Sequence, residues 1–215
     1  MSSPRIALIL PIAAATLALG GCIGVDAGPT TTQTRDVDAF TRLKAEDEVD
    51  VNLRVGESRR LRVRAGEKVI DDIRTEVRDG TLYVAYDGPS IREGRLLVEV
   101  SAPTIEALAI TGASDVRVDA LDADALDIRV SGAGDIAAEG RVRRLTLDIS
   151  GAGDADLAEL VADDARVELS GSGDADVRAS GLLDAEVRGA GDLAYRGDPR
   201  VRQDVSGSGE IEHAG

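Results

Sequence analysis

Residues 130–136 read VSGAGDI, residues 149–155 read ISGAGDA and residues 169–175 read LSGSGDA, and these near-copies decide the fold. Related segments, ITGASDV before them and VRGAGDL and VSGSGEI after them, bring the number to six. Their first glycines are Gly112, Gly132, Gly151, Gly171, Gly189 and Gly207, so the spacing is 18 to 20 residues. This period is too short for a two-helix repeat. It suits one coil of a parallel β-helix, in which successive coils stack about 4.8 Å apart.

The repeats therefore predict a right-handed parallel β-solenoid of about six short coils, starting near residue 108. Equivalent aliphatic residues in the coils should stack inside it as a ladder. They are Ile110, Val130, Ile149, Leu169, Val187 and Val205. Small residues such as Ala137, Ala155 and Ala175 suit a narrow interior. We expect the repeated glycines to supply the positive φ angles of tight corners.

The residues before the repeats alternate between apolar and polar with a period of two, as in VDVNLRV at 49–55. This alternation is typical of half-buried β-strands, and no stretch keeps a helical period for three turns. Asp79-Gly80 lies between two such runs and predicts a tight hairpin. We expect an all-β domain over residues 37–215, in which antiparallel strands cap the solenoid.

The N-terminus predicts export. Residues 1–21 contain an apolar run, Ile6 to Leu19, that ends in Leu19-Gly20-Gly21-Cys22. This ending resembles the bacterial lipobox, which implies a signal peptide over 1–21 and lipidation of Cys22, the only cysteine in the chain. The alternatives are an ordinary secretory signal followed by a chance cysteine, or an uncleaved anchor helix. Residues 22–36 contain Gly, Pro and a Thr run, and we predict a flexible, lipidated tether there.

Charge and composition narrow the partners. Without residues 1–21 the chain has 24 basic and 40 acidic residues, a net charge of −16, which argues against nucleic acid and anionic lipid head groups as partners. Aromatic residues make up only 2%, which argues against a sugar-stacking platform. We expect a cell-envelope protein held at the membrane by its lipid. Because Ile23 is not the Asp of an inner-membrane retention signal, the outer membrane is favoured if the host has two membranes.

The strand-rich opening, the strand–Pro–strand step between Val98 and Ile105 and the repeated S-G-[AS]-G-D turns resemble the "putative auto-transporter adhesin, head GIN domain" family. The resemblance covers about Phe40 to Ile211, nearly all of the mature chain. It implies a right-handed β-helix-like fold outside the cytoplasm and no enzyme activity, with no catalytic residues to carry over. The chain departs from the pattern at Arg188, where the other repeats have Ser or Thr, and at Ser114, where they have Gly.

A column of acidic residues follows the glycines of the repeats. It consists of Asp115, Asp135, Asp154, Asp174, Asp192 and Glu210. Calcium-binding nonapeptide repeats place an Asp every nine residues, so the spacing here does not match them. We expect each carboxylate to accept backbone N–H groups at its own turn. Weak cation binding is the alternative.

Nucleophilic and metal chemistry have few candidate residues. His213 is the only histidine and lies near the C-terminus, so we expect it to be frayed rather than a general base. Ser131, Ser150 and Ser170 recur with the repeat, as structural hydroxyl groups would. We therefore predict no catalytic, cofactor-binding or metal-binding residue, and an adhesin-like or envelope interaction module that is not an enzyme. The alternative is a β-helix lyase or hydrolase acting on an envelope polysaccharide, which would need a basic groove; the arginines are dispersed along the sequence.

Overall fold

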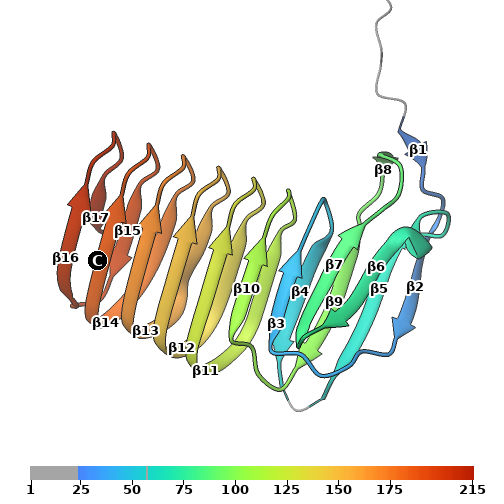
Figure 1. Ribbon diagram of the computed structural model, residues 1–215, viewed down its shortest axis with the longest axis horizontal. Helices are drawn as coiled ribbons and strands as arrows, with labels where there is room; N and C mark the ends of the chain where they lie inside the picture. The colour runs from blue at the N-terminus through green and yellow to red at the C-terminus, as the bar shows by residue number, and fades with distance from the viewer. Residues whose placement is uncertain (1–23, 57) are drawn as a thin grey trace, which may run out of the picture.

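The computed structural model describes residues 24–215 except residue 57, and it is built almost entirely of β-strands (Figure 1). The strands before the repeats are β1 (Val25–Asp26), β2 (Thr30–Arg35), β3 (Arg42–Ala45), β4 (Asp50–Val55), β5 (Arg60–Gly66), β6 (Ile73–Arg78), β7 (Thr81–Tyr86), β8 (Ile91–Glu93) and β9 (Leu97–Ala102). A single 3-10 turn, η1 (Ile70–Asp72), precedes β6. No helix among the described residues is long and apolar enough to cross a membrane.

The repeats form a parallel β-solenoid of about five turns, close to the six coils that the sequence predicts (Figure 1). Its strands are β10 (Ala107–Ile110), β11 (Val116–Val130), β12 (Ile136–Ile149), β13 (Ala155–Leu169), β14 (Ala175–Val187), β15 (Leu193–Arg196), β16 (Arg200–Val205) and β17 (Ile211–His213). The long strands β11 to β14 bend and contribute to both faces of the solenoid. In β11, Val116–Asp119 pairs with β4, whereas Asp127–Val130 pairs with β10.

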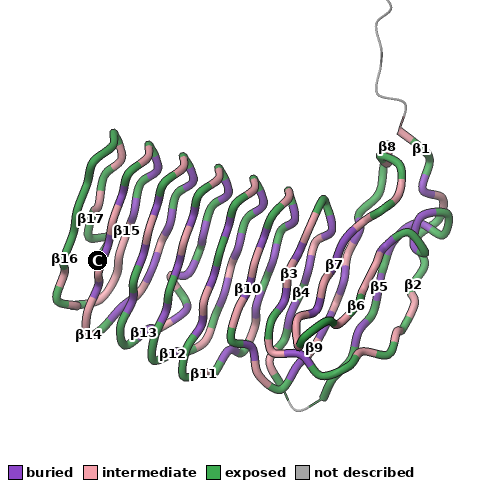
Figure 2. Tube along the Cα trace, in the orientation of Figure 1, coloured by how far each residue is buried: buried purple, intermediate pink, exposed green. Residues whose placement is uncertain are grey.

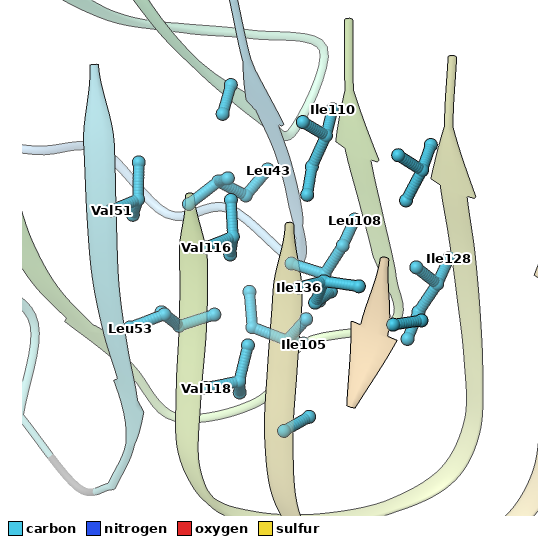
Figure 3. Close-up of a cluster of buried hydrophobic side chains, with 14 of the residues drawn as sticks. Leu43, Val51, Leu53, Ile105, Leu108, Ile110, Val116, Val118, Ile128 and Ile136 are labelled. Atoms are coloured by element: carbon cyan, nitrogen blue, oxygen red, sulfur yellow. The ribbon is translucent and has the colours of Figure 1, made fainter. Parts of the chain in front are cut away.

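The bends give the solenoid two faces. The β4 face consists of β5, β9, β4, the first parts of β11 to β14, β15 and β17. The β3 face consists of β6, β7, β3, β10, the second parts of β11 to β14, and β16. Apolar side chains from the two faces point toward each other, for example Leu53 and Val118 opposite Leu108 and Ile128 (Figure 3).

The predicted aliphatic ladder is present in every coil that has a neighbour on both sides. Five of its six members are at most 1% exposed: Ile110, Val130, Ile149, Leu169 and Val187. Val205, in the last coil, is 43% exposed because none of the described strands covers that coil from outside (Figure 2). Ala155 and Ala175 are buried as predicted, but Ala137 is only half-buried, and its neighbour Ala138 fills the interior position instead.

Glycine is required at the corners of the coils, but for a reason other than the predicted positive φ. None of the glycines of the S-G-x-G-D segments has a positive φ, so that expectation is wrong. At Gly132, Gly151, Gly171, Gly189 and Gly207 an added Cβ would lie 2.8–2.9 Å from the carbonyl carbon of the equivalent glycine one coil earlier. These corners stack backbone on backbone, and a side chain has no room between them.

The two departures from the repeat pattern do not interrupt the coils. Ser114 is fully buried, and its hydroxyl donates to the carbonyl oxygen of Glu46, in the loop between β3 and β4, at 3.2 Å. The Arg188 side chain lies at the surface and forms an ion pair with Glu186, while its backbone N–H donates to the Leu169 carbonyl as the other coils do.

The N-terminal half combines the predicted antiparallel strands with a continuation of the solenoid. β2 with β5, β5 with β9 and β6 with β7 are antiparallel, and they close this end. β3 and β4 instead run parallel to β10 and β11, and so extend the stack. The hairpin at Asp79-Gly80 joins β6 to β7 as predicted, and both of its residues have positive φ (49° and 72°), the conformation of a type I′ turn.

The prediction of a flexible tether over residues 22–36 is wrong for most of the described part of that segment. Thr30–Arg35 forms β2 and pairs along its whole length with β5. The Arg35 guanidinium, partly buried, donates to the carbonyl oxygens of Ile70 and Ile73 and to Thr75, and burial lowers its pKa. The sequence of β2 is polar on both faces, so it lacks the alternation of apolar and polar residues that predicts a strand. Hydrogen bonds to β5 hold it at the edge of the sheet.

Candidate functional site

The predicted lipidation residue, Cys22, and the predicted signal peptide lie outside the described residues. The membrane anchor therefore stays a prediction from the sequence. The sites that the structure can show are on the outer surface of the β4 face, where two rows of charged residues cross the strands.

The acidic column forms a continuous ladder along this face. Each Oδ1 accepts the backbone N–H of the next acidic residue, one coil further on. The distances are 3.2 Å from Asp135 to Asp115, 2.8 Å from Asp154 to Asp135, 2.8 Å from Asp174 to Asp154, 2.7 Å from Asp192 to Asp174 and 2.8 Å from Glu210 to Asp192. The prediction that carboxylates accept backbone N–H groups is confirmed, but the donors belong to the next coil and not to the same turn.

Sequence reasoning missed the first member of the ladder. Asp50, at the start of β4, accepts the N–H of Asp115 at 3.2 Å through its Oδ1. Its other oxygen forms an ion pair with Arg95, with 2.5 Å between Nε and Oδ2, and this hydrogen bond raises the pKa of the guanidinium. Asp50 lies outside the repeats, so only the pairing of β4 with β11 could identify it. Within the described residues, no group of three or more His, Cys, Asp or Glu side chains is arranged to hold a metal ion.

The residues that could have suggested nucleophilic chemistry have structural positions. The hydroxyls of Ser131, Ser150 and Ser170 lie 3.4–3.5 Å from the carbonyl oxygens of Ile110, Val130 and Ile149, and all of these contacts link one coil to the preceding one.

His213 is not frayed, contrary to the prediction. It belongs to β17, stacks on Tyr195 with 5.0 Å between ring centroids, and its Nε2 lies 3.0 Å from the Gly197 carbonyl oxygen. The imidazole therefore packs against the last complete coil.

A basic groove lies at the N-terminal end of the β4 face. It has a volume of about 320 Å³, and its charged lining consists of Arg54, Arg60, Arg62, Glu99, Arg117 and Asp119. The four arginines come from β4, β5 and β11 and lie up to 63 positions apart in the sequence, from Arg54 to Arg117. They become neighbours only through the pairing of β5 with β9, β9 with β4 and β4 with β11. These arginines are therefore far apart in the sequence but close together in the fold.

The four groove arginines are exposed, and none of them forms an ion pair with a described residue. Two carboxylates, Glu99 and Asp119, lie in the same lining, which leaves the groove with a formal charge of +2. A smaller hollow of about 290 Å³ lies beside Arg64, also on β5, and beside Arg95, whose charge is paired with Asp50. Guanidinium groups that have no internal partner present several donors in a planar fork, the arrangement that binds carboxylate, phosphate and sulfate groups.

Charge changes sign along the β4 face. Its middle outer row runs through paired positions from Arg62 to Glu99, Asn52, Arg117, Ala137, Asp156, Asp176, Ala194 and Glu212. Its two arginines, Arg62 in the cap and Arg117 in the first repeat strand, lie on either side of Glu99, and every charged residue beyond Arg117 is acidic. Screening limits the interaction between exposed charges to about 8 Å at physiological ionic strength, so the acidic coils beyond the first few do not cancel the groove.

Residues 39–199 match the model of the family described as "Putative auto-transporter adhesin, head GIN domain". The chain belongs to this family. The match covers the cap except β1 and β2, the basic groove and all but the last coil of this head GIN domain, and it confirms the resemblance seen in the sequence. A comparison with curated protein sequences found no match.

Solved structures share the fold of this head GIN domain. A putative adhesin from Bacteroides fragilis superimposes with a TM-score of 0.74 at 21% identity, covering 88% of this chain and 100% of that one. A putative adhesin from Parabacteroides merdae gives 0.57 at 17% identity, covering 88% and 98%. A putative lipid binding protein from Parabacteroides distasonis gives 0.56 at 18% identity, covering 87% and 98%. At these identities the similarity establishes the architecture.

Proposed function

We propose that this protein is a lipid-anchored, adhesin-like module of the cell envelope that binds anionic groups of a surface partner through the basic groove. The observation that carries the proposal is the cluster of Arg54, Arg60, Arg62 and Arg117, four exposed guanidinium groups that share one hollow and have no ion-pair partner among the described residues. The rigid sheet beneath them fixes their spacing, so little side-chain order has to be gained on binding beyond the arginines themselves.

The chemistry of the groove favours phosphate, sulfate or carboxylate groups carried on a polymer. Each exposed charge contact contributes modestly by itself, so several contacts along an extended ligand are needed for useful affinity. The overall charge of −15 opposes a long, uniformly anionic chain such as nucleic acid. A ligand with spaced anionic groups fits a basic end of limited extent better than a continuous polyanion does.

The anchor completes the proposal. Lipidation at Cys22 would hold the module at the membrane, with only a few residues between the lipid and β1. Ile23 at the second mature position favours the outer membrane in a host that has two membranes. Cys22→Ser should leave an unprocessed precursor or release a soluble form, measured by membrane fractionation and N-terminal sequencing. A variant that fractionates with membranes and has the same mature N-terminus as the parent would contradict the anchor.

The names of the structural neighbours support a binding role over catalysis, because two are described as putative adhesins and one as a putative lipid binding protein. One observation favours the alternative of a polysaccharide lyase or hydrolase. Glu99 and Asp119 lie in the same groove as the arginines, and glycoside cleavage uses paired carboxylates. Incubation with an anionic polysaccharide followed by a reducing-end assay separates the two functions, since a binding module releases no new ends.

Adhesion of cells tests the proposed function at the level of the envelope. Cells that display the full chain should adhere to a surface coated with a sparsely sulfated dextran, which carries spaced anionic groups, and not to neutral dextran. Arg54→Gln with Arg62→Gln should abolish most of this adhesion. Arg141→Gln with Arg144→Gln removes the same charge from exposed arginines outside the groove, and this control should adhere as the parent does. Equal loss in both double variants would show that net charge, and not the groove, causes adhesion.

A further inference from the structure

The last coil leaves both of its strands open at one end of the molecule (Figure 1). Among the described strands, β16 pairs only with β14, and β17 pairs only with β15. Their outer edges thus carry a row of backbone N–H and C=O groups that no described strand uses. An edge of this kind is a template for pairing with another chain unless the sequence prevents it.

The register of β16 on β14 shows which side chains lie over the core. Val201, Gln203 and Val205 continue the columns of Leu183, Ala185 and Val187, which are at most 2% exposed. Arg200, Arg202 and Asp204 continue the outer columns. The open edge therefore presents two valines and one glutamine on its inner side and charged residues on its outer side, and Val205 is one of only two large hydrophobic residues described as exposed.

We propose that β16 pairs antiparallel with β16 of a second copy of this chain, across a two-fold axis through Gln203. In antiparallel strands the residues directly opposite each other lie on the same face of the sheet. This axis places Val201 opposite Val205 of the second copy on the inner side. On the outer side it places Arg202 opposite Asp204 of the second copy, and the symmetry repeats both pairs.

The choice of axis follows from complementarity. An axis through Arg202 would place two arginines against each other and Val201 opposite a glutamine. With the axis through Gln203, the two glutamine side chains face each other, and an amide can both donate to and accept from its copy. With this axis, both valines face valines and Arg202 faces Asp204, so Arg200 is the one residue of the six-residue strand that has no such partner.

The dimer would also bury apolar surface at the end of the β4 face. Ile211 lies half-buried over the fully buried Leu193 at the same open end, and a second copy continuing the β3 face would approach it. The two basic grooves would then lie at the far ends of an elongated dimer, because the groove is at the cap and the pairing edge is at the last coil (Figure 1). Two grooves on one particle raise the strength of attachment to a multivalent surface. This inference does not depend on what the groove binds.

Disulfide trapping of the full-length protein in membranes tests the pairing. The axis puts position 203 opposite itself, at a Cβ separation of about 4.5–5.5 Å for directly opposed residues, which is within reach of a disulfide after small adjustments. Gln203→Cys should give a disulfide-linked dimer under mild oxidation at least ten times faster than Arg141→Cys, a matched exposed position on the side of a coil. Equal rates for the two variants would overturn the proposal, and the parent chain measures any background from Cys22.

A charge exchange tests the register. In the Gln203→Cys background, either Arg202→Asp or Asp204→Arg places like charges opposite each other at positions 202 and 204. The two-fold axis repeats this repulsive pair, so either variant should slow cross-linking about tenfold. The double exchange, Arg202→Asp with Asp204→Arg, restores opposite charges and should recover the parental rate. Thermal melts of all variants check that the coil is intact. Failure of the double exchange to recover cross-linking, with an unchanged melt, would reject this register.

Discussion

Replacing one corner glycine tests why the repeats contain glycine at all. In Gly171→Ala, the new Cβ would lie 2.8 Å from the carbonyl carbon of Gly151, 3.1 Å from its nitrogen and closer still to its oxygen. Ordinary contact begins at about 3.5 Å, so the two coils must separate locally. The neighbouring bonds that hold this corner are Ser172 N–H to Gly151 at 3.0 Å and Ala190 N–H to Gly171 at 2.9 Å.

The cost of this substitution follows from two contributions. Overpacking costs about 1–3 kcal/mol, and weakening two backbone hydrogen bonds adds about 1 kcal/mol each. We therefore expect a loss of about 3–5 kcal/mol, which corresponds to roughly 10 °C for a domain of this size. Gly56→Ala is the control, because an added Cβ there meets nothing within 4 Å. Thermal melts followed by circular dichroism compare the two variants.

The same pair of variants can refute the reasoning. If Gly171→Ala melts within 2 °C of Gly56→Ala, the corners do not depend on close backbone approach. Gly171→Asn separates this account from one based on positive φ, because asparagine tolerates the left-handed region but is larger than alanine. Close approach predicts that asparagine is at least as destabilising as alanine, whereas a positive φ predicts that it is milder.

Three further predictions test the ladder, the modularity and the cap. Asp154→Asn should melt near the temperature of the parent because the amide oxygen still accepts the N–H of Asp174, while Asp154→Ala should lose about 1–3 kcal/mol of stability. Millimolar calcium should not shift the melting temperature of the parent, and a rise that grows with calcium concentration would indicate a cation site. Deletion of residues 149–168 should leave a folded, shorter solenoid, whereas deletion of half that segment should misalign the columns; equal loss of β-signal in both would count against independent coils. Arg35→Ala should lower the melting temperature by several degrees because two carbonyls lose their donor, and no change would mean that β2 is not part of the stable domain.

The repeats determined what the sequence could predict. Six near-copies, spaced 18 to 20 residues apart, show that each residue has equivalents in the neighbouring coils. The buried column from Ile110 to Val187 and the acidic column could therefore both be identified from the sequence. The hairpin at Asp79-Gly80 was predictable for a local reason, since few other dipeptides adopt two consecutive positive φ angles.

The features that escaped prediction depend on contacts between distant strands. Periodicity cannot distinguish an antiparallel cap from strands that pair in parallel with the solenoid, as β3 and β4 do. The basic groove exists only because β5, β9, β4 and β11 are neighbours in space. The reason for glycine at the corners was wrong because a sequence shows that a side chain is absent but not which atom occupies its place.

The most direct test of the central claim is a binding titration of the purified full chain with a small sulfated oligosaccharide, followed by calorimetry at two salt concentrations. Binding should be saturable and should weaken as salt is raised, as expected for exposed charge contacts. We also expect at least a tenfold loss of affinity, about 1.4 kcal/mol, in Arg54→Gln with Arg62→Gln, and no loss in Arg141→Gln with Arg144→Gln. Undiminished binding by the groove variant, or equal weakening in both variants, would contradict the assignment of this groove as the binding site.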